Sequence, residues 1–182
     1  MNATISLQTN YDRRTIWLHW LTALTILFMW GGAHAIDWFP KGPLRVDARS
    51  VHIVVGTALG VLVAYRLFWR IAHGTKFADH AGWAGLLARL MHRALYLLVF
   101  GTVALGMFNA WVRGDKLFSL GRIPPYGAYD PAARHALSES VVGWHELGAN
   151  LILILAAGHA VMALYHQFVL KDGLLRRMMP AQ

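Results

Sequence analysis

The chain has 182 residues, of which 57% are hydrophobic, and it carries a formal net charge of +8 and no cysteine. An ordinary soluble domain is only about 45–50% apolar, so this composition indicates a membrane protein. The basic residues are spread between apolar runs instead of forming one patch, which argues against nucleic acid as a partner. Without cysteine, the chain cannot form disulfides, thiolate-ligated clusters or a CxxCH cofactor attachment.

The first two apolar runs predict membrane-spanning helices over residues 15–35 and 51–71. Each is long enough, as a helix, to cross a hydrocarbon core of about 30 Å. The first run contains His19 and ends in Ala-His-Ala, which resembles a signal-peptidase site; it is longer than a signal-peptide core, so we expect an uncleaved span. The second begins with His52, and Gly56, one turn later, opens a GxxxG face that we interpret as space for a flat ligand.

Two further runs predict spans over residues 86–112 and 141–170. The third span carries His92 near its start. The fourth is almost uncharged yet carries His145 and His159, whose spacing places them on nearly the same helix face, about 21 Å apart. Because ionisable side chains inside a membrane are costly and usually functional, these two imidazoles are the strongest candidates for a site.

Polar loops separate the four spans, at residues 36–50, 72–85 and 113–140. Four spans place both termini on one side of the membrane. Ten of the 17 Lys and Arg residues fall on that side and seven on the other, so the positive-inside rule predicts cytoplasmic termini. We therefore predict an all-α fold in which residues 1–182 form a single integral membrane four-helix bundle.

This topology assigns a depth to each histidine. His19 lies toward the cytoplasmic side of the first span, and His52 begins the second span on the outer side. In the fourth span, His145 lies near the outer surface and His159 toward the cytoplasm. Histidines of equal depth then pair as His52 with His145 and His19 with His159. The core of a four-helix bundle is where such sites are built from facing helices, so two bis-histidine sites are predicted.

His92 shares the depth of His19 and His159, and three roles stay open for it: a ligand, a hydrogen-bond donor to a ligand, or a proton carrier near a quinone. The other histidines are interpreted as hydrogen-bonded or interfacial side chains: His34, His73, His80, His135 and His166.

Zinc and copper also bind imidazole. The segment that begins at His145 resembles a zinc-protease HExxH helix only at its start, because Ala149 stands where the second histidine belongs. The sequence has no Walker loop and no GxGxxG, so nucleotide chemistry has no support.

Several segments, in this order and spacing, resemble the bacterial cytochrome b561 family, which shares its architecture with the cytochrome b subunits of nickel-iron hydrogenases. The resemblance covers essentially the whole chain. The matching residues are His19-Trp20, His52 with Gly56, Arg66 with Arg70, His92 with Tyr96-Leu97-Leu98, Arg113-Gly114, Trp144-His145-Glu146 with Ala149-Asn150, and His166, Lys171-Asp172, Leu175 and Met178-Met179-Pro180.

The resemblance implies a multi-pass protein of the bacterial inner membrane that holds two non-covalent b haems. It implies that His19, His52, His145 and His159 are the axial ligands of the haem iron, which agrees with the pairing by depth. It further implies an oxidoreductase that moves electrons from periplasmic superoxide through both haems to ubiquinone.

Basic residues lie on both sides of the predicted bundle. Those of the third loop would form a cationic vestibule that steers superoxide toward the outer haem, or a solvated loop, or partners of the haem carboxylates. Those at the cytoplasmic ends would pair with haem carboxylates or anionic lipid. The first set is Arg113, Lys116, Arg122 and Arg134, and the second is Arg13, Arg14, Arg66 and Arg70.

Two alternatives stay open. One is a cytochrome b subunit that links quinone to a partner dehydrogenase or hydrogenase. The other, of a different class, is a haem-free proton or metal transporter with a histidine relay. A homodimer through the GxxxG face is also open, although we favour the ligand pocket because His52 is one turn away.

Overall fold

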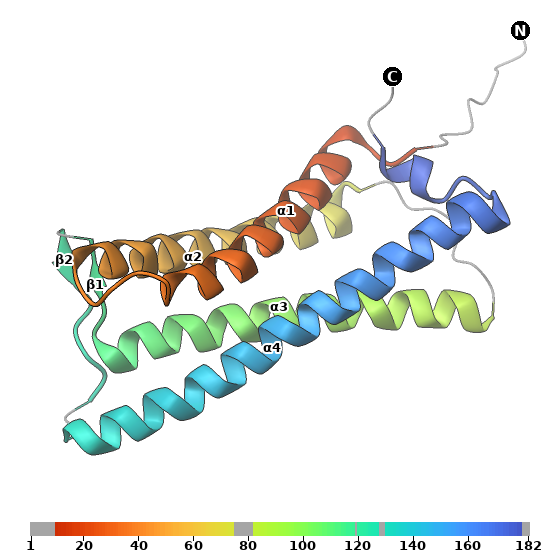
Figure 1. The fold of residues 1–182 in the computed structure, drawn as a ribbon. Coiled ribbons are helices and arrows are strands. Elements are labelled where there is room, and N and C mark those ends of the chain that lie inside the picture. The colour runs from red at the N-terminus through yellow and green to blue at the C-terminus, as the bar shows by residue number, and fades with distance from the viewer. Residues whose placement is uncertain (1–9, 75–81, 119, 128–129, 180–182) are drawn as a thin grey trace, which may run out of the picture.

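Four long helices dominate the computed structural model, which describes residues 10–74, 82–118, 120–127 and 130–179. Each is long and apolar enough to cross a membrane. Figure 1 shows α1 running beside α2, and α3 beside α4. The helices are α1 (Arg13–Ile36), α2 (Pro43–Ala72), α3 (Trp83–Arg113) and α4 (Pro131–Tyr165). His80, interpreted above as structural, lies outside the described residues.

Short elements close the two ends of the bundle. At one end, β1 (Lys116–Leu117) pairs antiparallel with β2 (Gly121–Arg122) in a hairpin between α3 and α4. At the opposite end, α4 continues into a π-helical turn, η1 (His166–Leu170), and a 3-10 turn, η2 (Leu175–Met178), follows (Figure 1). The hairpin end corresponds to the side predicted to face outward.

The start of α1 is tied to the end of the chain. Asp12 caps α1 by accepting a hydrogen bond from the Thr15 amide at 2.9 Å, and it also accepts one from the Trp69 indole at 3.0 Å. The Trp20 indole donates to the Met178 carbonyl at 2.8 Å. The two ends of the described chain therefore lie at the same end of the bundle, as an even number of spans requires.

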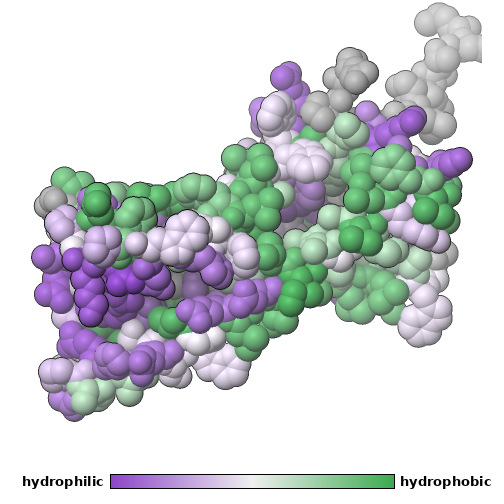
Figure 2. Space-filling model, in the orientation of Figure 1, coloured by the Kyte–Doolittle hydropathy of each residue, from purple (hydrophilic) through white to green (hydrophobic). Residues whose placement is uncertain are grey.

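Large apolar side chains face outward along all four helices. Leu97 is 73% exposed, Val61 67% and Ile154 65%. Figure 2 shows hydrophobic residues over much of the visible helix surface, with hydrophilic residues gathered at the hairpin end. This surface suits a lipid environment, because lipid tails are as apolar as the side chains and their exposure to lipid carries no hydrophobic cost.

A small apolar core lies between the two levels of histidine. Ile152 belongs to this core and stands seven residues from both His145 and His159, about two helical turns, or roughly 10 Å, from each. The core therefore separates an outer half of the bundle from an inner half. Its buried members are Leu59, Val63, Val99 and Ile152.

The helices extend beyond the predicted spans, so the loops are shorter than predicted. α2 begins at Pro43 and α4 at Pro131, each with proline in the first turn, where its fixed φ suits a helix. Asp130 caps α4 by accepting from the Ala133 amide at 2.9 Å. The prediction of residues 113–140 as one loop was wrong, because the segment contains the hairpin and the first ten residues of α4. A fall in hydropathy indicates where a helix leaves the membrane, whereas the capping residues indicate where the helix itself ends.

Candidate functional site

The outer pair of predicted site residues comes together across the bundle. His52 of α2 and His145 of α4 have ring centres 6.1 Å apart, with their planes at 70°. A metal–imidazole bond is about 2 Å long, so two imidazoles on opposite sides of one ion have ring centres about 6 Å apart. This separation fits a pair of axial ligands to one iron.

The inner pair repeats this geometry at the other end of the bundle. His19 of α1 and His159 of α4 have ring centres 6.3 Å apart, with their planes at 67°. The structure thus brings together the two pairs that equal depth predicted. Their role as haem ligands stays a prediction, and α4 contributes one imidazole to each pair.

A cavity of about 480 Å³ lies at the outer pair. Both imidazoles line it, together with Gly56 and apolar side chains such as Leu59 and Val99. A Cβ on Gly56 would lie 3.1 Å from the Met29 side chain of α1, so this glycine keeps α1 and α2 close beside the cavity. The size and mostly apolar lining suit a flat, largely apolar ligand.

The orientation of His145 is set by the backbone of α3. Its Nδ1 lies 2.8 Å from the Thr102 carbonyl oxygen, which can only accept, so Nδ1 carries the proton. The other ring nitrogen, Nε2, then keeps its lone pair for a metal, which is the usual arrangement at metal-bound histidines. Gly106 lies one turn after Thr102, and a Cβ there would stand 2.9 Å from Cε1 of His145.

His19 has the opposite hydrogen-bond partner. Nη2 of Arg66 lies 2.8 Å from Nδ1 of His19, and a guanidinium can only donate, so this nitrogen accepts and Nε2 carries the proton. For His19 to bind a metal, this contact must be released. The same guanidinium lies 5.6 Å from the Tyr96 ring centre, and the buried Tyr96 hydroxyl has no hydrogen-bond partner among the described residues. At the inner pair, Nδ1 of His19 therefore contacts a positive charge, whereas at the outer pair Nδ1 of His145 contacts a neutral carbonyl.

His92 lies beside the inner pair. Its ring centre is 5.3 Å from that of His159, and its Nδ1 lies 2.6 Å from the Ala88 carbonyl oxygen, to which it donates. Among the described residues, no three His, Cys, Asp or Glu side chains come together as ligands for a metal ion. This part of the chain therefore shows no cage of the zinc or copper type.

The remaining described histidines have local partners. His34 donates to the Trp30 carbonyl at 2.8 Å, and His73 stacks on Trp69 with ring centres 4.7 Å apart. The His166 ring is 2.5 Å from an Asp172 carboxylate oxygen. His135 lies 3.5 Å from a Glu139 carboxylate oxygen. These contacts agree with the structural interpretation of these four histidines.

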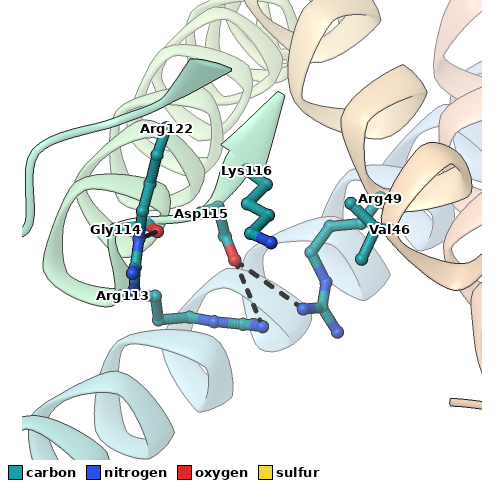
Figure 3. A pocket seen from close by; sticks show the side chains of 7 residues that line it. All are labelled: Val46, Arg49, Arg113, Gly114, Asp115, Lys116 and Arg122. Atoms are coloured by element: carbon teal, nitrogen blue, oxygen red, sulfur yellow. Dashed lines mark hydrogen bonds and ion pairs between the residues drawn. The ribbon is translucent and has the colours of Figure 1, made fainter. Parts of the chain in front are cut away.

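A second, cationic cavity of about 270 Å³ lies at the hairpin end of the bundle. Figure 3 shows Arg113, Lys116 and Arg122, three of the basic residues expected on this side, around the cavity, together with Arg49 of α2 and the carboxylate of Asp115. Arg49, Arg113 and Asp115 also line the cavity of the outer histidine pair, so the two cavities adjoin.

Sequence reasoning missed two charged residues of this cavity, and Arg134, which it placed on the same side of the bundle, does not line it. Arg49 stands three residues before His52, a spacing that could have placed both on one face of α2. Asp115 follows Arg113-Gly114, but the neighbouring sequence carries no signal that its side chain turns into the cavity. Arg134 lines neither cavity; it lies at the start of α4, with Nη2 3.5 Å from the Gly127 carbonyl oxygen.

Asp115 is the acidic group at the centre of this cluster. Its side chain is 11% exposed, and one oxygen lies 3.4 Å from Arg113 and 3.7 Å from Arg49. Burial raises the pKa of this carboxyl above its usual value, and the neighbouring guanidinium groups oppose the rise. The carboxylate therefore offsets part of a strongly positive cavity.

Known proteins resemble the chain along almost its whole length. The family model described as prokaryotic cytochrome b561 matches residues 10–181. Cytochrome b562 of Cereibacter sphaeroides is 34% identical, over 94% of this chain and 96% of that protein. Cytochrome b561 homolog 1 of Escherichia coli is 30% identical, over 93% of this chain and 97% of that protein. A protein of Yersinia pestis named probable superoxide oxidase CybB is 27% identical, over 93% and 96%.

The match to the family model, the four membrane-spanning helices and the paired imidazoles lead to the same conclusion. The chain belongs to the prokaryotic cytochrome b561 family of multi-pass membrane proteins that bind haem b and transfer electrons.

Proposed function

We propose that this protein is a di-haem oxidoreductase of the bacterial inner membrane that passes electrons from superoxide on the outer side to ubiquinone. The observation that carries the proposal is that two imidazole pairs share α4, with ring centres 6.1 Å apart at His145 and 6.3 Å apart at His159. The four histidines are then the axial ligands, and both termini face the cytoplasm.

The outer level suits haem b, because Nε2 of His145 keeps its lone pair for a metal and the adjoining cavity is mostly apolar. At the inner level, His19 would bind iron only after its contact with Arg66 is released, because Nδ1 accepts from the guanidinium and Nε2 carries the proton. When bound by two imidazoles, haem iron exchanges single electrons without binding oxygen directly, because both axial positions are filled. The chain contributes ligand orientation, through the Thr102 carbonyl at His145, and a dry separation between the two sites, through the apolar core around Ile152.

The cationic cavity supports an anionic electron donor. Four basic side chains surround a single carboxylate there, and the cavity adjoins that of the outer pair through Arg49 and Arg113. A cleft with one sign of charge raises the local concentration of oppositely charged small molecules and speeds their arrival. The Yersinia pestis relative named a probable superoxide oxidase adds support for this donor.

The test combines haem counting with electron transfer. The purified chain should contain two b haems, superoxide should reduce them, and decylubiquinone should reoxidise them. The balanced reaction takes two superoxide anions, one quinone and two protons to two dioxygen molecules and one quinol. Haem that accepts electrons from a co-purifying dehydrogenase or hydrogenase, and not from superoxide, would instead indicate the subunit role. A colourless protein would revive the transporter hypothesis.

Removing one guanidinium from the cationic cavity should slow the reaction with superoxide. For Arg113→Gln we expect the bimolecular rate of haem reduction to fall several-fold at low ionic strength, with a weaker salt dependence, because steering scales with local charge. Stopped-flow absorbance at increasing salt measures this. Arg134→Gln is the matched control, since Arg134 lines neither cavity; an equal effect of both variants would contradict a local role.

Arg66 should tune the inner haem alone. Arg66→Gln is expected to lower the reduction potential of that haem by about 40 to 90 mV, because a buried unit charge nearby favours the reduced state by roughly 1–2 kcal/mol. Arg66→Lys, which keeps the charge, should stay near the parent value. Optical redox titration resolves the two haems, and a shift confined to the outer haem would refute the assignment of Arg66 to the inner pair.

A further inference from the structure

The cationic cavity contains its own anion. Of the seven residues that line it, four are basic and Asp115 is the one acid. One carboxylate oxygen of Asp115 faces both Arg113 and Arg49, at 3.4 Å and 3.7 Å (Figure 3). Both distances exceed the 2.7–3.2 Å of a hydrogen bond, so neither guanidinium is engaged in a close bidentate pair with it.

The backbone around Asp115 is held on both sides. Its amide donates to the Ala110 carbonyl at 3.1 Å, and its carbonyl accepts from the Ile123 amide at 2.9 Å. The hairpin that follows is fastened to α2 by Ser50, whose fully buried hydroxyl accepts from the Phe118 amide at 2.8 Å. The backbone that carries this carboxylate is therefore held at the wall of the cavity.

This arrangement bears on which anions the cavity admits. A volume of about 270 Å³ is large enough for several waters or for a hydrated inorganic anion, at about 30 Å³ per water. Paired guanidinium groups without a counter-charge would retain chloride or phosphate from the medium, and a retained anion would block the approach of a transient one. The carboxylate lowers this affinity without removing the net positive charge.

We propose that Asp115 is a specificity-determining residue, an internal anion that keeps resident inorganic anions out of the cationic cavity while leaving it positive enough to attract a small singly charged donor. This rests on the proposed function for the identity of the donor, but the exclusion of resident anions can be tested without it. The charged groups that face Asp115 are Arg49 of α2, Arg113 of α3, and Lys116 and Arg122 of the hairpin.

The proposal is tested in two experiments. The first measures chloride binding to the haem-loaded protein in micelles, by line broadening in chloride NMR. Asp115→Asn keeps the shape and removes the charge, so chloride should bind about tenfold more tightly or better. Asp47→Asn is the matched control, because it removes one negative charge two residues from Arg49 without lining the cavity. Chloride affinity that is equal in the parent and Asp115→Asn would overturn the proposal.

The parent protein offers the same comparison if Asp115→Asn does not fold. Burial raises the pKa of Asp115, and protonation removes its charge while the four basic neighbours stay cationic. Chloride binding by the parent should therefore strengthen as pH falls through this pKa. Asp115→Glu, which keeps a titratable carboxyl, should show a similar pH dependence. Chloride binding that is flat with pH in the parent counts against the proposal.

The second experiment measures haem reduction by superoxide with and without chloride. We expect Asp115→Asn to react faster than the parent in chloride-free buffer and to lose this advantage as chloride is added, whereas the parent responds weakly. A variant that is slower in both buffers would make Asp115 a positioning residue for Arg49 and Arg113 and overturn the proposal. If superoxide fails to reduce even the parent, the proposed function fails, while the chloride-binding experiment still decides the role of Asp115.

Discussion

Replacing His52 with alanine should reduce the haem content of the purified protein from two groups per chain to one and abolish electron transfer from superoxide. His52 provides one of two imidazoles 6.1 Å apart, and one imidazole does not hold the iron in a bis-histidine site. His159→Ala should remove the other haem. Because a bound ligand stabilises the fold by mass action, each variant should also lose about 3 kcal/mol or more of stability.

Double variants test the pairing itself. His52→Ala combined with His145→Ala removes two ligands of one site and should still retain one haem. His52→Ala combined with His159→Ala should retain none. Pyridine haemochrome assays count the haem, and reduced-minus-oxidised spectra show which component is lost. Equal haem content in the two double variants would refute the pairing.

His135→Ala is the matched control for these variants. His135 lies on α4 and its side chain is 73% exposed, so the variant should retain both haems.

His92→Ala tests whether His92 is a haem ligand, which the sequence left open. If His92 is only a neighbour of His159, as its bond to the Ala88 carbonyl suggests, haem content should stay at the parent value while the inner haem spectrum shifts. Loss of the inner haem would make His92 a ligand.

Gly106→Ala should release the outer haem selectively. The added Cβ would lie 2.9 Å from Cε1 and 3.1 Å from Nδ1 of His145, so the imidazole must move away from the Thr102 carbonyl. Overpacking of this kind costs about 1–3 kcal/mol. Loss of a hydrogen bond that orients a metal-bound histidine typically weakens metal binding about 10- to 100-fold. Haem transfer to excess apomyoglobin measures the loss.

Gly101→Ala supplies the control on the same helix. A Cβ at Gly101 has no heavy atom within 4 Å, so alanine should leave both haems in place. Alanine also favours a helix over glycine by up to about 1 kcal/mol, so the melting temperature should not fall. If Gly106→Ala releases haem no faster than Gly101→Ala, the close approach of α3 to His145 is not needed for haem binding.

Much of the architecture was predictable from apolar runs alone. Each predicted span lies inside one of the helices, with α4 and η1 together containing the fourth. Helix ends were less predictable, because residues 44–50 are polar enough to resemble a loop. The proline at position 43 starts α2 there, outside the apolar run. Backbone hydrogen bonds continue a helix into water as well as into lipid, so composition does not mark its end.

The depth of each candidate site residue was set by the sequence. A helix rises about 1.5 Å per residue, and the membrane gives all four spans a common axis, so a residue's distance from the end of its span fixes its level. His52 with His145 and His19 with His159 follow from this, and the structure places both pairs within about 6 Å. Their pairing needed no knowledge of side-chain packing.

Rotation about each helix axis was decided only by the tertiary structure. In water, an apolar stripe tells which face of a helix turns inward, but these helices are apolar on nearly all sides because lipid and core are alike in polarity. The sequence therefore could not show that Gly106 opens the Thr102 carbonyl to His145, or that Arg66 reaches His19. Nor could it place Asp115 between Arg49 and Arg113, since that contact joins α2 to the turn after α3. Such contacts depend on how the helices rotate against one another, and packing alone fixes that rotation.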